Sequence, residues 1–565
     1  MRGVLRTLIR ATAAGWAAVA VYVALTLPPR RVALDAVVPA THVLGGYHIH
    51  TSRSDGSGTV DSVAAEAEQS GLRFLIFTDH GDATRTPDAP AYRHGVLCID
   101  AVEVSTREGH IVALGLSHGA PYPLAGSARD VIDDIHRLGG WAVIAHPDSP
   151  SAALRWTGQG QGPAFDGVEW LNVDSEWRDE SPWRLLATAA RSVVRPSESI
   201  ASLFTRPVRT LQRWDTAARQ RNVFGLAALD AHARIGWREA EEPRGRSVLR
   251  RPTYGAMFGS LAQVAVLDAP LSGDAANDAT AVVAALVRGR SYSIVRAFGS
   301  PAVLQFGADR GNEHLQMGDR VQAGEPATLR AEITGAPGAA VALLADGRVI
   351  TRGVGGLTTT AAAPGVYRVE ALWPGADVPW IVSNPIVIMS DRNGPPPATQ
   401  TLAAAAERRT INLDSPWAIE KEPSSDGQHR VVAGELQFDY RLGPGASHGQ
   451  YAALAVPVTP DAGIDRVAFT ARADRPMRVS IQVRLPVSKD GQRWRRSIYL
   501  DQTSRPIVVR LQDFEPADAP TTRRPIVAPI QTLLFVVDTI NSSPGSAGTM
   551  WLSDISLGID RLGER

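Results

Sequence analysis

The chain of 565 residues is too long for one ordinary domain and is long enough for about three or four. A content of 44% hydrophobic and 21% charged residues is that of a globular protein, and a net charge of zero at pH 7 gives no electrostatic support for nucleic-acid binding. A single cysteine, Cys98, excludes an intrachain disulfide and a thiolate zinc cluster, so any metal site must use His, Asp and Glu.

The N-terminus carries the features of a membrane anchor. Three arginines precede an uncharged run from Ala11 to Leu27, which as a helix would be roughly 25 Å long, the low end for a membrane span. No clean small-x-small cleavage site precedes Pro28, which favours an uncleaved signal anchor over residues 1–31 rather than a cleaved signal peptide. Because more arginines precede the run than follow it, we expect the catalytic part to lie outside the cytoplasm, in the periplasm or extracellular space.

From residue 42 to about 300 the sequence alternates strand-like and helix-like segments. The hydrophobic pattern predicts helices near 60–70 and 128–138, the first with Thr59 as its N-terminal cap and Gly71 at its end. It predicts strands over residues 42–51, 73–78, 102–104, 110–116, 141–145, 168–171 and 223–228. This alternation indicates a parallel β/α architecture, in which a site gathers at the C-terminal ends of the strands.

A helical insertion is expected from about residue 181 to 222. Between 182 and 221 it carries eight arginines against only Glu198 and Asp215. Such a segment is either a solvated insertion or an element that faces a membrane surface or a substrate.

Beyond about residue 301 the pattern becomes all-β. Alternating residues after Pro364-Gly365 predict an immunoglobulin-like β-sandwich over 301–390, and the NGPPP stretch marks a linker over 391–411. A second β domain over 412–562 loosely resembles galactose-binding jelly rolls, on the segment IQTLLFVVDTI followed by GTMWLSDISL. We expect this domain either to bind a glycan or to have a purely structural role.

Histidine is concentrated in the first half of the chain, where ten of the 13 lie between His42 and His232. Several of them follow predicted strands together with carboxylates, and the candidate metal ligands are His48, His50, Asp55, His80, Glu103, His110, His146, Asp230 and His232. Residues i and i+2 of an extended chain point to the same face, so His48 and His50 can bind one metal, and Asp230 and His232 share this spacing. Imidazole and carboxylate suit zinc, manganese or iron, and the set is large enough for two or three divalent ions.

Other polar residues near these motifs have simpler interpretations. His118 is an alternative to His110 as a ligand, and Asp79 is expected to orient a neighbouring ligand rather than to bind metal. Arg53 and Arg234 neighbour the ligands and can clamp a phosphate, although both can equally be ordinary surface arginines. The remaining histidines of this region are expected to be structural or exposed, namely His42, His94 and His136.

These motifs resemble the PHP family, the polymerase and histidinol phosphatase domains. The matching segments occur in the family's order and are HIHTSRSDG, FTDH, EVSTREGH, AHPD and LDAH, with DGVEWLN at 166–172 similar to a late strand. Over about residues 42–300 the resemblance implies an α/β fold, a distorted (β/α)7 barrel with a trinuclear metal centre. The two all-β, sandwich-like domains would follow this barrel, and the transmembrane anchor would precede it.

The resemblance also implies which ligands hold which ion. The first ion would be bound by His48, His50, Glu103 and Asp230, the second by Glu103, His110 and His146, and the third by Asp55, His80 and His232. His48, Glu103 and Asp230 are therefore the expected catalytic residues. Some family members carry histidine at the position of Asp55, and this aspartate would lower the net charge of its metal.

The expected reaction is hydrolysis by a metal-bound hydroxide, since coordination lowers the pKa of water toward about 7. We expect a phosphoesterase or phosphodiesterase acting outside the cytoplasm. One alternative is a hydrolase of the same fold that cleaves a carboxylic ester, carbamate or amide. Another is a non-catalytic surface protein that binds glycans.

Overall fold

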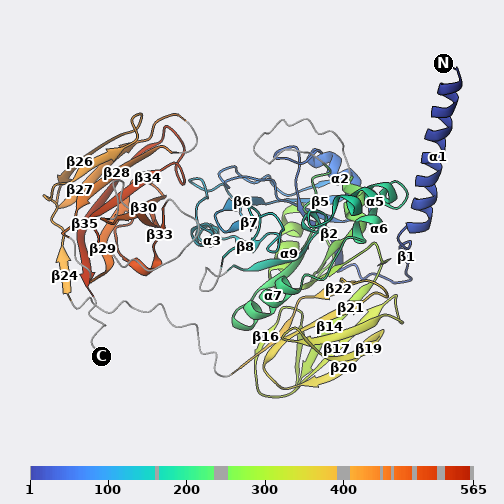
Figure 1. Ribbon diagram of the computed structural model, residues 1–565. Coiled ribbons are helices and arrows are strands. Elements are labelled where there is room, and N and C mark those ends of the chain that lie inside the picture. Colours follow the sequence, from blue (N-terminus) through green and yellow to red (C-terminus); the bar gives the residue numbers. More distant parts are fainter. Residues whose placement is uncertain are drawn as a thin grey trace. The chain divides into compact units, whose positions relative to one another are not determined.

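The structure, a computed structural model, describes residues 2–158, 165–234, 252–390, 407–445, 449–459, 463–486, 493–517 and 529–559. It has a mixed α/β fold that divides into two compact units (Figure 1). The first unit comprises Met1–Gly81, Pro87–His118 and Ile135–Gly394, and the second comprises Asp82–Thr86, Gly119–Asp134 and Pro395–Arg565. Residues 391–406 of the expected linker lie outside the described residues.

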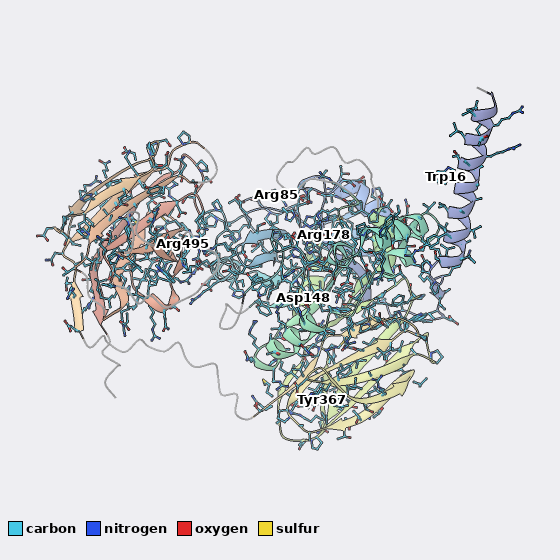
Figure 2. The ribbon with its side chains drawn as sticks, in the orientation of Figure 1. Trp16, Arg85, Asp148, Arg178, Tyr367 and Arg495 are labelled. Atoms are coloured by element: carbon cyan, nitrogen blue, oxygen red, sulfur yellow. The ribbon has the colours of Figure 1, made fainter. Side chains whose placement is uncertain are left out.

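The first unit begins with the apolar helix α1 (Arg2–Thr26). Its segment Val4–Thr26 has 23 residues, is not buried, and would be about 35 Å long. By length and composition it can serve as a membrane anchor or as a signal sequence. Trp16 projects from this helix with 70% of its surface exposed (Figure 2). The helix ends before Pro28 and Pro29, neither of which can donate a backbone hydrogen bond.

A five-stranded sheet supplies one side of the site region, in the order β10-β9-β8-β7-β6. Its strands are β6 (Val102–Thr106), β7 (Gly109–Leu114), β8 (Trp141–Ile144), β9 (Gly167–Asn172) and β10 (Phe224–Ala228). β8, β9 and β10 run parallel, but β7 is antiparallel to both β6 and β8. The expectation of a parallel architecture is therefore wrong here, because only Arg107 and Glu108 separate β6 from β7, too few for a crossover.

A second sheet supplies the other side. One half of it contains β12 (Ser291–Ile294), β11 (Ala262–Val266), β2 (His42–Ile49), β3 (Phe74–Phe77) and β5 (Val96–Asp100), with β4 (Ala91–Arg93) at the edge. β2, β3 and β5 are parallel, whereas β11 pairs antiparallel with β2 and β12. Two isolated parallel bridges, Ile49 with Ala231 and His80 with Glu103, connect the strand ends of the two sheets. Phe74, Ile76 and Leu226 are among the residues of one shared hydrophobic core.

Two of the helices lie where the hydrophobic pattern predicts them. The first is α2 (Val60–Gln69), and its cap is confirmed because the Thr59 side chain accepts a hydrogen bond from the Ser62 backbone. The expected helix over 128–138 is α3 (Ala128–Arg137). The others are α4 (Val173–Arg178), α5 (Pro182–Ser192), α6 (Pro196–Ala201), α7 (Val208–Gln220), α8 (Tyr254–Ser260) and α9 (Ala275–Val287).

Strands from residues 301–390 continue the second sheet, since β12 pairs with β22 (Ile381–Ser383). The expected boundary at residue 300 therefore falls within a continuous sheet. It extends through β21 (Gly365–Leu372), β23 (Ile386–Met389), β16 (Arg320–Gln322), β18 (Ala340–Ala345) and β19 (Arg348–Val354). A separate four-stranded sheet contains β14 (Val303–Arg310), β15 (Glu313–Gln316), β17 (Ala327–Thr334) and β20 (Gly356–Ala361). The short strands β1 (Val32–Ala33) and β13 (Gly299–Ser300) pair with each other.

The second unit is built from two six-stranded sheets around one apolar core. The first sheet has β24 (Glu407–Thr410), β26 (Asp426–Val432), β27 (Glu435–Arg441), β29 (Ile464–Ala473), β32 (Arg505–Arg510) and β35 (Ala547–Ile559). The other has β25 (Ala418–Lys421), β28 (Tyr451–Pro457), β30 (Met477–Arg484), β31 (Arg493–Leu500), β33 (Glu515–Pro516) and β34 (Thr532–Asp538). The buried Arg478 joins this sandwich to the segment 119–134 through Asp134, with Nε 2.6 Å from the carboxylate.

Candidate metal centre

All nine predicted ligands converge where the two sheets meet. Most come from the C-terminal ends of strands or from the residues that follow them. Asp55 lies instead in the loop between β2 and α2, and Glu103 and His110 lie near the starts of β6 and β7. The parallel bridge between His80 and Glu103 and the bridge between Ile49 and Ala231 hold these ends together. Segments far apart in the sequence thus place imidazoles and carboxylates within a few ångströms of one another.

The first group consists of His48, His50, Glu103 and Asp230, all buried. The Nε2 atoms of the two histidines are 3.1 Å apart, and each lies 3.2 Å from Oε2 of Glu103. Oδ1 of Asp230 lies 3.5 Å from Nε2 of His48 and 3.3 Å from Nε2 of His50. These four atoms therefore face one another in the way that ligands surrounding a single cation do.

The other oxygen of Glu103 faces a different pair of imidazoles. Oε1 lies 2.9 Å from Nδ1 of His110 and 2.8 Å from Nε2 of His146. Nδ1 of His80 lies 3.2 Å from Oε2 of the same carboxylate. Glu103 thus presents one oxygen to each of two groups of histidines, which is the geometry that a carboxylate needs to bridge two cations.

A third group surrounds Asp55. Its carboxylate lies 3.2 Å from Nε2 of His232, 3.5 Å from Nδ1 of His50 and 3.9 Å from Nε2 of His80. Together these four residues form one of three clusters that can hold a metal ion, and His48, His50 and Glu103 form another. His80, Glu103 and His110 form the third, so all three clusters use predicted ligands.

The chemistry of the donor set fits a cation. Within the described part of the chain, the buried Nδ1 of His80 makes no hydrogen bond. Burial, the largest cause, lowers the pKa of His80, which favours the neutral imidazole that binds metals. A neutral nitrogen with a free electron pair, held beside carboxylates, matches what zinc, manganese or iron binds.

The carboxylates and imidazoles of the cluster compensate one another's charges. Burial opposes ionisation of Glu103 and Asp230, but neighbouring imidazoles outweigh it and hold the pKa of each carboxyl well below its usual range. Burial also disfavours the charged imidazoles, yet the carboxylates raise the pKa of His146 to about 9 and that of His232 to about 10. The carboxylates are therefore stabilised by nearby positive charge, which protons on the histidines or bound cations can supply.

Three ligands adopt a backbone conformation that is rare for residues other than glycine. The φ angles are 64° for His48, 30° for His146 and 48° for Asp230. In addition, the pairing of β2 with β3 shifts register between Tyr47 and Ile49. His48 and His50 therefore point to the same site because the strand bulges at His48. The expectation that both face one site agrees with the structure, but its stated cause, a regular extended strand, is wrong. Such strain is typical of functional sites.

Sequence reasoning missed Glu169, a buried residue of β9. Its Oε1 lies 2.5 Å from Nδ1 of His48, and its Oε2 accepts hydrogen bonds from the backbone of His146 at 2.7 Å and from Asn172 at 2.9 Å. Asn172 also donates to Oδ2 of Asp230 at 3.2 Å. An acidic residue inside the apolar strand GVEWLN was the available signal, because a buried carboxylate needs partners.

The side chain of Asp79 organises the loop that carries the first ligands. It accepts hydrogen bonds from the backbone of Thr51 at 2.7 Å and from the hydroxyls of Ser54 and Thr51 at 2.7 and 2.8 Å. Arg53 points to three carboxylates, those of Asp79, Asp88 and Asp100, at 2.9–3.3 Å. Arg234 lies closer to the cluster, where its Nη1 donates to the backbone oxygen of Asp55 at 3.3 Å.

The other histidines lie outside the cluster. His42 contacts the Tyr292 hydroxyl at 3.3 Å, His94 pairs with Asp61 at 3.2 Å, and His136 pairs with Asp166 at 2.7 Å. His118 contacts the neighbouring Ser117 at 3.0 Å, whereas His110 contacts Glu103. His110 therefore lies in the cluster, whereas His118 contacts the adjacent residue Ser117.

Two cavities differ in whether they adjoin this cluster. A cavity of about 260 Å³ adjoins it directly, because His146 and Glu169 form part of its wall with Arg155, Glu176 and Arg209. Arg178 and Asp148, labelled in Figure 2, come from the same region, and Arg178 pairs with Asp174. Burial lowers the pKa of Arg178, but the charges of Asp174, Asp230 and Asp55 outweigh it and raise that pKa.

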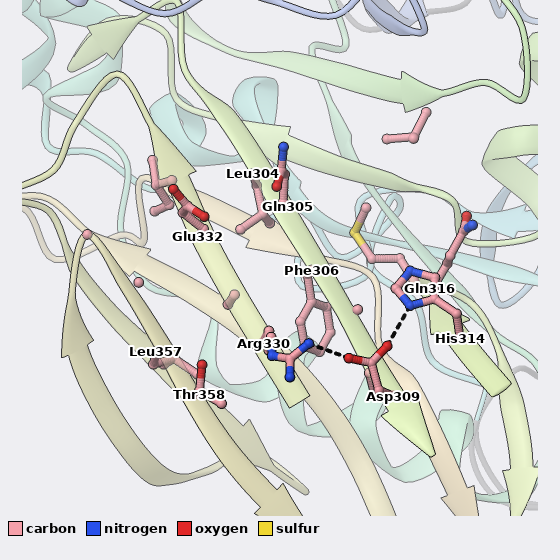
Figure 3. A pocket seen from close by; sticks show the side chains of 18 of the residues that line it. Leu304, Gln305, Phe306, Asp309, His314, Gln316, Arg330, Glu332, Leu357 and Thr358 are labelled. Carbon is pink, nitrogen blue, oxygen red and sulfur yellow. Dashed lines mark hydrogen bonds and ion pairs between the residues drawn. The ribbon is translucent and has the colours of Figure 1, made fainter. Parts of the chain in front are cut away.

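A larger cavity of about 960 Å³ lies over β14 and β17. Its charged residues compensate one another, since Asp309 pairs with His314 at 2.9 Å and also with Arg330 (Figure 3). None of the nine predicted ligands is among its described lining residues. Of these two cavities, the smaller one therefore adjoins the cluster.

No family model matches the chain. Over 104 residues the chain is 33% identical to phosphoribosyl 1,2-cyclic phosphate 1,2-diphosphodiesterase of Eggerthella lenta, a match that covers 17% of this chain. The chain spans 39% of the length of that relative.

Solved structures similar to this chain include carbohydrate-binding modules. The family 11 module from Clostridium thermocellum, in complex with a β-1,3-1,4-mixed-linked tetrasaccharide, is 13% identical, with a TM-score of 0.22, covering 28% of this chain and 98% of the module. The agarase AgWH50C is 13% identical, with a TM-score of 0.19, covering 27% of this chain and 24% of the agarase.

Proposed function

We propose that this protein is a metal-dependent phosphoesterase, and that its substrates include phosphodiesters. The observation that carries the proposal is the placement of Glu103, with one carboxylate oxygen toward His48 and His50 and the other toward His110 and His146. Two or three divalent ions, zinc, manganese or iron, would be held by the nine ligands in the grouping that the PHP resemblance implies. Their chemistry is to lower the pKa of a coordinated water and to neutralise the charge that develops on phosphoryl oxygens.

We also infer that the two sheets form the distorted barrel of the PHP fold. The bridges from Ile49 to Ala231 and from His80 to Glu103 support this, since they join the sheets at two separate edges. The mixed strand directions account for the distortion. In this arrangement the ligands occupy one mouth of the barrel.

The chain's own residues would orient the ligands and bind the substrate. Glu169 fixes the ring of His48 through Nδ1, so that Nε2 points to the group. Arg178 and Arg234 are the proposed phosphate-binding residues. The charges of Asp230 and Asp55 contribute to the raised pKa of Arg178, and Arg234 donates a hydrogen bond to the Asp55 backbone. Arg53 is a weaker candidate, since it already pairs with three carboxylates.

A phosphoester is favoured over a carboxylic ester, carbamate or amide by the partial likeness to a diphosphodiesterase. We further propose that α1 stays in place as an anchor, with the metal centre on the non-cytoplasmic side of the membrane. Three arginines, Arg2, Arg6 and Arg10, lie in the first half of this helix, which fits an N-terminus on the cytoplasmic side.

The test is metal analysis of the full chain in detergent, combined with a panel of aryl phosphodiesters, phosphomonoesters and carboxylic esters. We expect two to three ions per chain and turnover of a phosphodiester, both lost together in His50→Ala. The matched control is His94→Ala, which removes a histidine that pairs with Asp61 at the surface. A folded protein that stays metal-free in excess zinc, manganese and iron would contradict the proposal, as would faster cleavage of carboxylic esters.

A further inference from the structure

Helix α5 and the turn that follows it expose a row of large apolar side chains. Trp183 on the helix is 80% exposed and Leu186 61%, and Val193 and Val194, which follow the last helical residue, are 73% and 57% exposed. The backbone of Val193 is still helical, so the spacing of about 100° per residue continues through it and places all four side chains within an arc of roughly 100° on one side. Thr188, the buried residue of α5, lies on the opposite side. The stripe formed by Trp183, Leu186, Val193 and Val194 therefore faces away from the protein to which α5 is attached.

The same segment is purely basic. Residues 182–195 contain Arg184, Arg191 and Arg195 and no acidic residue. Arg184 and Arg191 are seven positions apart, which places them on the same flank of the helix, about a quarter turn from the stripe. Arg184 is tied to Glu180 at 2.7 Å. An apolar stripe with arginines beside it is the composition of helices that lie in the interface of a bilayer.

The position of α5 places this stripe next to the end of the apolar helix α1. Nη1 of Arg191 donates to the backbone oxygen of Thr26 at 3.4 Å, and Arg195 donates to the backbone oxygen of Pro28. The Arg31 backbone donates to Glu198 at 3.2 Å, which connects α6 to the same stretch. Figure 1 shows α5 and α6 beside the end of α1. If α1 spans a bilayer, residues 26–31 lie at its surface, and so does α5.

We propose that α5 is a second membrane contact, which inserts Trp183, Leu186, Val193 and Val194 into the boundary between headgroups and acyl chains. The inference rests on the proposed anchor but not on the proposed hydrolase activity. A lipid bilayer is the partner that matches this surface. The stripe lies next to the end of the helix that is expected to span the same bilayer, and arginines lie beside the stripe. Attachment through both α1 and α5 would fix the orientation of the first unit on the membrane.

Spin labels on the full chain test this proposal in vesicles of phosphatidylcholine with phosphatidylglycerol. Labels are attached at Leu186→Cys and Val194→Cys, with Trp16→Cys as the label inside α1 and Val354→Cys, 72% exposed on β19, as the control outside the stripe. The native thiol does not compete, since Cys98 is buried and burial raises its pKa to about 11. Collision rates with oxygen and with a water-soluble nickel complex then report the depth of each label.

We expect oxygen accessibility to exceed nickel accessibility at 186 and 194, at a depth shallower than at 16, while position 354 remains water-like. Water-like labels at 186 and 194 beside a lipid-exposed label at 16 would overturn the proposal and leave the anchor intact. A water-like label at 16 would reject the anchor and this proposal together. Labels at 186 and 194 that are immobilised and shielded from both reagents would instead indicate a protein partner, which also overturns it.

Discussion

Oε1 of Glu169 lies 2.5 Å from Nδ1 of His48, the shortest contact between any candidate ligand and a residue outside the ligand set that the structure describes. Both side chains are buried, at 0% exposure. A metal-binding histidine is usually held in one tautomer and one ring orientation by such a carboxylate. Glu169 is therefore a positioning residue for His48, and it also holds the backbone of His146 at 2.7 Å.

Replacing Glu169 with glutamine is expected to weaken metal binding by about 10–100-fold, because the amide cannot accept the same charge-assisted hydrogen bonds. The measurement is metal affinity by competition with a chelator, together with turnover at saturating metal. The matched control is Glu68→Gln on the exposed side of α2. Unchanged affinity in a folded Glu169→Gln protein would show that His48 does not depend on this contact.

Glu103 and His232 should differ in how many ions they control. Glu103 faces both the His48–His50 pair and the His110–His146 pair, whereas His232 contacts Asp55 at 3.2 Å in the third group. We expect Glu103→Ala to lose at least two ions per chain and His232→Ala to lose one. Both should lower turnover at least about 100-fold, since metal ions supply several kcal/mol of transition-state stabilisation.

Metal content per chain after gel filtration, measured by mass spectrometry, decides this prediction. The His94→Ala protein again serves as the control, and circular dichroism checks that each variant is folded. An equal loss of ions in the Glu103 and His232 variants would mean that Glu103 does not bridge separate positions.

A half-buried carboxyl beside the smaller cavity should make stability depend on pH. Burial, together with the charges of Asp179 and Glu180, raises the pKa of Glu176 to about 7, against the lowering effect of hydrogen bonds from Thr205. A folded pKa above the unfolded value of 4.5 means that the folded state favours the protonated acid. The contribution of Glu176 to stability is therefore present at low pH and is lost as pH rises from about 4.5 through 7.

Glu176→Gln is expected to remove this loss, because glutamine stays neutral and its side-chain oxygen can still accept from Thr205. The melting temperature of the variant should exceed that of the wild type by an amount that grows between pH 5 and 7 and is constant above. Thermal unfolding at several pH values provides the measurement. A difference that does not change with pH, or one that shrinks as pH rises, would contradict the assignment to Glu176.

The convergence of the nine candidate ligands could be anticipated because it depends on local sequence patterns. The candidate ligands, the cap at Thr59 and the helix after residue 128 were all inferred from polar residues placed next to apolar runs. The bulge at His48 could not be predicted in this way, because strand periodicity assumes a regular extended backbone. Nor could the antiparallel pairing of β6 with β7, which depends on which strand lies next to which in three dimensions.

Features that depend on contacts between distant parts of the sequence could not be predicted, for the same reason. Glu169 was not identified, since its role depends on contacts with His48 and His146 that are distant in sequence. β12 pairs with β22 and so joins two regions that the sequence pattern assigns to separate domains, with a boundary at residue 300. Asn384 reinforces this junction, because its side chain accepts from the Gly225 backbone at 2.7 Å and donates to the Ser291 backbone oxygen at 3.1 Å.

A buried ion network attaches the helical insertion to the strands beyond residue 300. Arg368 on β21 is 1% exposed and lies 2.9 Å from Asp215 on α7, and it also pairs with Glu370. Glu370 in turn binds Arg206 through two hydrogen bonds of 2.7 and 2.8 Å. Each charge in this network therefore has a partner of opposite sign, which offsets the cost of burial.

Arg368→Met should destabilise the first unit by about 3–5 kcal/mol, because it leaves the carboxylates of Asp215 and Glu370 buried with too little compensation. Burial already raises the pKa of Asp215, against the lowering effect of Arg368, so loss of the arginine should raise this pKa further. We expect part of the lost stability to return as pH falls, since protonation of Asp215 removes an unpaired charge. Urea unfolding at pH 5 and pH 8 measures both effects, with Arg352→Met on the exposed side of β19 as the control. Equal stability of the Arg368 and Arg352 variants would show that the network does not hold α7 to β21.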